Sequence, residues 1–73
     1  MTKLIIARYD SKGAVANAFD DLISTGIPEE KIRIDKERHA ISVTAPPTSE
    51  AEITEILRRH RPLEVKKRED VPA

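Results

Sequence analysis

The fold is decided by residues 3–26, which read KLIIARYDSKGAVANAFDDLISTG. The apolar run at positions 4–6 contains β-branched residues and predicts a short strand. Asp10 or Ser11 then supplies a side-chain oxygen for the free amides that begin a helix. Beyond this cap, apolar residues recur at the three- and four-residue spacing of an amphipathic helix. The inward residues of that helix are expected to be Val15, Ala16, Ala18, Phe19, Leu22 and Ile23.

The second half of the chain repeats this strand-and-helix pattern. Gly26 followed by Pro28 ends the first helix. Alternating residues then predict two hairpin strands, over 31–35 and 39–45, joined by a polar loop. Ser49 and Glu52 fit a capping box that starts a second helix, which stops at Pro62. Beyond it we expect a last edge strand over 63–68 and a loose tail over 69–73. The expected inward residues are Ile32, Ile34, Ile41, Val43, Ile53, Ile56, Leu57, Leu63 and Val65.

The order strand, helix, strand, strand, helix, strand predicts a ferredoxin-like α/β plait of the α+β class. Its four strands form an antiparallel sheet in the order 4-1-3-2, with both helices on one face. We expect a single domain over residues 1–73, with an ordered core over about 2–68.

Composition narrows the functional classes. The chain has 73 residues, no cysteine, and 13 basic against 13 acidic side chains. A chain without disulfides suits a reducing cytoplasm. No apolar run is long enough for a signal peptide or a membrane span. The net charge of zero is also far below the strongly positive charge expected of a dedicated nucleic-acid-binding domain.

The face of the sheet that carries no helix is the expected interaction surface. If Leu4 and Ile6 point toward the helices together with Ile41 and Val43, the alternate residues of the central strands are exposed. These residues are Lys3, Ile5, Ala7, Ala40, Ser42 and Thr44. RNA-binding plaits place aromatic side chains at such positions so that bases can stack. Small and aliphatic residues instead favour contact with another protein, although a lone exposed isoleucine is also ordinary.

The turn before the first helix is a candidate site for an anion, because helix amides and the helix dipole attract negative charge. The candidate residues are Arg8, Asp10, Ser11, Lys12 and Gly13. The alternative is that the Asp10 or Ser11 cap already occupies those amides. Acylphosphatases use this loop with an asparagine on the hairpin, but the only asparagine here is Asn17 in the first helix.

No catalytic residues, cofactor or metal are expected. His39 and His60 lack a third ligand at a suitable spacing, and a copper chaperone of this fold would need a cysteine pair. The adjacent acidic residues at positions 20–21 and 29–30 are expected to point away from each other. They therefore do not form a carboxyl pair that shares a proton for acid–base catalysis.

The one concentration of positive charge is Arg58, Arg59, Arg61, Lys66, Lys67 and Arg68. Such a basic cluster suits an anion, an RNA backbone or an acidic partner. The same residues suit two structural roles equally well. The arginines at the end of the second helix complement the negative end of its dipole, and the basic residues of the last strand protect the sheet edge from aggregation.

Residues 3–34 resemble the small bacterial domain of general-stress and heat-induced stress proteins. The resemblance lies in Ile-Ile-Ala-Arg-Tyr-Asp-Ser at 5–11, an Ala-rich helix that contains Ala-Phe-x-x-Leu at 18–22, and Gly-Ile-Pro at 26–28. The chain departs from those domains at Ile27, where they usually place an aromatic residue, and it lacks the glycine-rich segment that often follows. The resemblance implies a stand-alone domain without catalytic or cofactor-binding residues.

A second similarity is to ACT domains, which are small-molecule sensors. It rests on Asp10, Gly13 and the pair Gly26-Ile27, whereas Lys12 replaces the usual proline.

Together these observations predict a cytoplasmic, non-enzymatic interaction module, linked to stress by the resemblance, that binds a protein partner or a second copy of itself through the open sheet face. The alternatives are an ACT-like sensor of an anionic ligand at the first strand–helix turn, and weak nucleic-acid binding through the basic cluster. No membrane association is expected.

Overall fold

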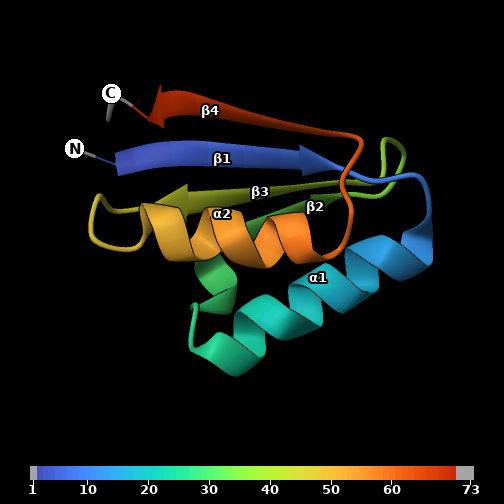
Figure 1. The fold of residues 1–73 in the computed structure, drawn as a ribbon, viewed down its shortest axis with the longest axis horizontal. Coiled ribbons are helices and arrows are strands. Elements are labelled where there is room, and N and C mark those ends of the chain that lie inside the picture. Colours follow the sequence, from blue (N-terminus) through green and yellow to red (C-terminus); the bar gives the residue numbers. More distant parts are fainter. Residues whose placement is uncertain (1, 71–73) are drawn as a thin grey trace.

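The computed structural model describes residues 2–70 (Figure 1). Along the chain, the elements are β1 (Thr2–Arg8), α1 (Lys12–Thr25), a short 3-10 helix η1 (Glu29–Lys31), β2 (Ile32–Asp35), β3 (Ala40–Ala45), α2 (Glu50–Arg59) and β4 (Glu64–Asp70). No helix in this part of the chain is long and apolar enough to cross a membrane.

The four strands form one antiparallel sheet in the order β2-β3-β1-β4. Both helices pack against the same side of it (Figure 1). The protein therefore has the predicted ferredoxin-like α+β plait, with the predicted strand order. The last strand runs through Asp70, two residues beyond the predicted end. The rest of the expected loose tail, residues 71–73, lies outside the described residues.

Helix α1 begins and ends as its sequence predicts. The Ser11 Oγ accepts a hydrogen bond from the Ala14 N–H at 3.2 Å. Gly26 adopts a left-handed conformation with φ of 107°, and the Ile27 N–H donates to the Leu22 carbonyl at 3.1 Å. This is the Schellman arrangement, in which glycine satisfies the last helical carbonyls without a Cβ clash.

Helix α2 is capped differently from the prediction. Ser49 lies at the N-cap, but its side chain makes no capping hydrogen bond. Its backbone has φ −114° and ψ −3°, close to a helical conformation, whereas a capping side chain needs an extended residue. The capping box predicted from Ser49 and Glu52 is therefore not formed.

The core lies between the helices and the sheet and is aliphatic apart from Tyr9. Its buried members are Ile5, Ala7, Tyr9, Val15, Ala18, Leu22, Ile32, Ile41, Val43, Ala45, Ile53, Ile56 and Leu57. Phe19, Ile27 and Val65 pack at its margin, partly buried.

Four residues predicted to point inward are exposed instead, namely Ala16, Ile23, Ile34 and Leu63. Ile23 lies at the edge of the buried stripe of α1, and Ile34 lies on edge strand β2. Leu63 is 63% exposed because it precedes β4, so the inward alternation of that strand begins only at Val65.

Candidate functional site

Strand β1 faces the opposite way from the prediction. Ile5 and Ala7 are completely buried in the core, whereas Leu4 and Ile6 are half-buried on the face without helices. The pairing of Ile5 with Val43 sets this orientation, because residues paired across strands share a face. The prediction that Ile5 and Ala7 belong to an exposed interaction face was therefore wrong.

The sequence could not settle this point because the run at positions 4–6 is apolar without alternation. A shift by one residue exchanges the two faces of a strand. Lys3 likewise lies on the helix side, at the margin of the sheet. On β3, Ser42 and Thr44 do point to the open face and are half-buried, as predicted.

Three rows of side chains cross the open face. The row toward the hairpin, Asp35, Ala40, Arg8, Glu64, has an acidic residue at each end, and two further rows lie beside it. The first of these two runs Arg33, Ser42, Ile6, Lys66 from β2 to β4, and the second runs Thr44, Leu4, Arg68. In each of these two rows an aliphatic residue of β1 occupies the centre and a basic residue lies on β4. Arg33 adds a basic residue on the opposite side of the first row.

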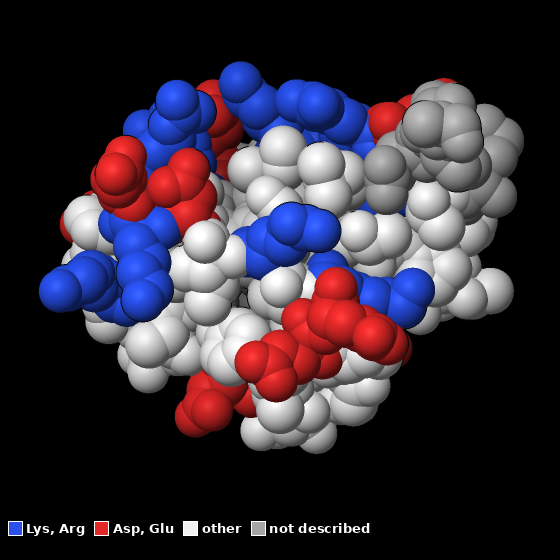
Figure 2. Space-filling model, turned by 180° about the vertical axis from the view of Figure 1, so that it is seen from behind, with Lys and Arg blue, Asp and Glu red and all other residues white. Residues whose placement is uncertain are grey.

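The cations of this face differ in how far they are neutralised. Arg8 and Lys66 both lie 3.7 Å from the same Glu64 carboxylate oxygen. Arg33 and Arg68 make no ion pair with the side chains of residues 2–69, so their charge is available among these residues. From behind the molecule, basic side chains line the edge where β4 runs, above an uncharged band (Figure 2). The open face therefore combines an apolar centre with basic side chains along β4 and mixed charges at the hairpin end, where Asp35 and Glu64 lie.

On the helix side, Glu50 joins the sheet to the start of α2. Its carboxylate accepts a hydrogen bond from the Lys67 Nζ at 3.2 Å, and its other oxygen lies 3.6 Å from the Lys3 Nζ. The Lys67 hydrogen bond, helped by the positive charge of Lys3, lowers the pKa of the Glu50 carboxyl below its ordinary value. Lys3 and Lys67 therefore serve this contact and do not belong to the open face.

Replacing Glu50 with Gln should flatten the acid limb of the stability curve. Because the Glu50 pKa is lowered on folding, its ionised carboxylate stabilises the fold above the unfolded-state pKa, and this stabilisation is lost as pH falls through the lowered value. Urea denaturation of both proteins at pH 7 and at several lower values measures the difference. Glu52→Gln, at an exposed position on the same helix, is the matched control; an equal effect from both variants would contradict the role of Glu50.

The predicted anion-binding turn does not form one site. Ser11 caps its own helix, and Arg8 is paired with Glu64. Arg8 and Asp10 line one depression, whereas Lys12 lines a different one beside α1. The turn therefore separates its charges instead of converging them on one ligand.

The predicted basic cluster is likewise dispersed. Lys66 and Arg68 lie on the open face, whereas Lys67 lies on the helix side. Arg59 is engaged with acids, which leaves Arg58 and Arg61 together at the connection from α2 to β4. Neighbouring residues of a strand point to opposite faces, so a consecutive basic run cannot form one patch.

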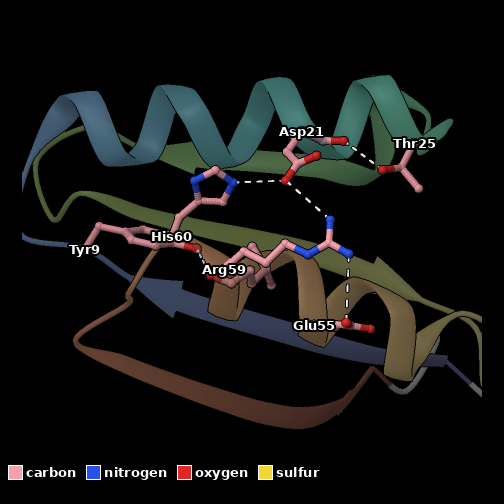
Figure 3. A network of polar contacts seen from close by, with 7 residues as sticks. Tyr9, Asp21, Thr25, Glu55, Arg59 and His60 are labelled. Carbon is pink, nitrogen blue, oxygen red and sulfur yellow. Dashed lines mark hydrogen bonds and ion pairs between the residues drawn. The ribbon is translucent and has the colours of Figure 1, made fainter.

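A polar network that the sequence did not indicate connects the two helices (Figure 3). The Asp21 Oδ2 lies 3.0 Å from the His60 Nε2 and 3.9 Å from the Arg59 Nη1. Arg59 also lies 3.8 Å from Glu55 within its own helix. Asp21 is only partly exposed. Its partners are 38 and 39 residues away along the chain, which no local pattern reveals.

This network is structural in character. Asp21, Arg59 and Glu55 are paired with one another within it, and His60 contacts the same Asp21 carboxylate. Among the side chains of residues 2–69, no three from His, Asp or Glu gather in a way that could hold a metal ion.

Fold and surface together define a ferredoxin-like α+β plait whose open sheet face has an apolar centre and basic side chains along β4. Comparisons with protein-family models, with curated proteins and with solved structures gave no match.

Proposed function

We propose that this protein is a non-enzymatic binding module whose open sheet face holds an acidic amphipathic helix of a protein partner. The observation that carries the proposal is the row Arg33, Ser42, Ile6, Lys66, in which basic ends flank an aliphatic centre. Lys66 shares its charge with Glu64, and the unpaired Arg68 lies two residues farther along β4 on the same face. A helix with one apolar stripe and carboxylates on both sides of that stripe is complementary to this pattern.

The dimensions of the sheet support a helix as the occupant. The row spans three strand spacings, or about 14 Å, since neighbouring strands lie about 4.8 Å apart. A helix with its side chains is about 10–12 Å wide. Arg33 and Lys66 therefore stand on either side of a helix laid over β1 and β3. Leu4 and Ile6, about 7 Å apart along their strand, would contact its apolar stripe.

Charge favours an acidic partner over a second copy of the chain. The acids of this face, Asp35 and Glu64, are already engaged with neighbouring groups, so a second copy would bring mainly its cations toward Arg33 and Arg68. Like charges across an interface are unfavourable. Nucleic acid is disfavoured because the face has aliphatic residues, and no aromatic ones, where bases would stack.

The test uses two synthetic peptides of identical composition. One has a leucine stripe flanked by glutamates when helical, and the other has the same residues scrambled. We expect the striped peptide to bind, its affinity to fall with added salt, and its amide-shift footprint to cover Leu4, Ile6 and Ser42. Ile6→Glu and Arg33→Glu should each weaken binding. Arg58→Glu, at an exposed residue away from the face, should not.

Other outcomes reject the proposal in distinguishable ways. Equal binding of the scrambled peptide would show only non-specific charge attraction. Tighter binding of oligouridylate than of the striped peptide would favour nucleic acid. A dimer in light scattering that Ile6→Glu dissociates would identify the face as a self-association surface.

A link to the stress response, and with it a bacterial cytoplasm, rests on the resemblance over residues 3–34 and stays a prediction. Protein abundance before and after heat shock measures it.

A further inference from the structure

A cavity of about 260 Å³ lies between the start of α1 and the β2–β3 hairpin. It is separate from the open sheet face, because Ile34 in its wall pairs with Ile41 and so belongs to the helix side of the sheet. The residues that line it are Lys12, Val15, Ala16, Ile34, Lys36 and His39.

The lining divides into an apolar wall and a basic rim. Val15, Ala16 and Ile34 supply the apolar wall, with Ile34 40% exposed although it is aliphatic. Lys12 and Lys36 are exposed and make no ion pair with any described residue. No acidic residue lines the cavity, so its positive charge is not neutralised from within.

The rim is held in place by backbone contacts. The Tyr9 N–H donates to the His39 carbonyl at 2.8 Å, which ties the hairpin to the segment before α1. The nearby Asp35 carboxylate is occupied within the hairpin, where it accepts from the backbone N–H groups of Glu37 and Arg38. The loop that carries Lys36 and His39 therefore has a defined shape, and its acid is not directed at the cavity.

We propose that this cavity binds a small organic anion with a compact apolar group. The carboxylate or phosphate of the ligand would lie among Lys12, Lys36 and His39, and its apolar part would contact Val15 and Ile34. A volume of 260 Å³ corresponds to about eight or nine water molecules at about 30 Å³ each, which suits a ligand of one ring.

The experiment is an amide-shift titration of the full chain with benzoate, phenyl phosphate, benzamide and inorganic phosphate. We expect the two aromatic anions to shift the amides of the lining residues and to bind about fivefold more tightly than benzamide, which lacks the charge, or inorganic phosphate, which lacks the ring. Comparing benzoate with phenyl phosphate identifies the preferred anionic group.

Variants separate the cavity from general charge attraction. Lys12→Gln and Lys36→Gln should each weaken benzoate binding about threefold, the scale of one exposed charge. Lys31→Gln, at an exposed lysine outside the cavity, should leave binding unchanged. Ala16→Leu should fill the cavity and abolish binding without disturbing the helix, since leucine is a good helix former. Equal affinity for benzoate and benzamide, or unchanged benzoate binding to Ala16→Leu, would overturn the proposal.

Discussion

Replacing Ile5 with Glu should unfold the protein, whereas replacing its neighbour Ile6 with Glu should leave it folded. Ile5 is completely buried between β3 and the helices, and a buried unpaired charge costs several kcal/mol. Stability for a chain of this length is about 4–11 kcal/mol in total. Ile6 lies on the open face, where a charged side chain reaches water, so its replacement should cost about 1 kcal/mol.

Circular dichroism and thermal denaturation of the two variants decide this prediction. A folded Ile5→Glu variant together with an unfolded Ile6→Glu variant would reverse the orientation of β1 and invalidate the open face described above. Because Ile6→Glu is expected to remain folded, it is also the variant of choice for the peptide-binding test.

The second large effect is an alkaline loss of stability through Tyr9. Its hydroxyl donates a buried hydrogen bond to the Leu57 carbonyl at 2.8 Å, and burial raises the Tyr9 pKa from 10.0 to about 12. The folded state therefore keeps the phenol neutral at pH values where the unfolded state ionises. This stabilisation is complete below pH 10 and is lost as pH rises through about 12. Two pKa units correspond to about 2–3 kcal/mol.

Tyr9→Phe isolates this contribution, because it removes the ionisable group while keeping the ring. At neutral pH the variant should lose about 1 kcal/mol, the net value of one hydrogen bond. The Leu57 carbonyl keeps a second donor, the His60 N–H at 3.3 Å. Denaturant unfolding of both proteins between pH 8 and 12 gives the comparison. Parallel curves across this range would contradict the predicted role of Tyr9, since lysine titration affects both proteins alike.

The secondary structure of this protein follows from its local sequence. Ser11 at the start of α1, Gly26 at its end and the alternation on β3 each act through neighbouring residues, so the elements and their order were predictable. Chain connectivity then limits four strands and two helices to few arrangements, and the predicted strand order was confirmed.

Tertiary structure alone decided which way β1 faces and which charges meet. The run at positions 4–6 has no alternation, so only its pairing with β3 selected Ile5 for the core and left Ile6 on the open face. Tertiary structure alone also brings Asp21 to His60 and Glu50 to Lys3 and Lys67. It likewise forms the cavity beside Lys12. Such surfaces join side chains that are distant along the chain. Their composition depends on strand register and helix packing, which local patterns do not encode.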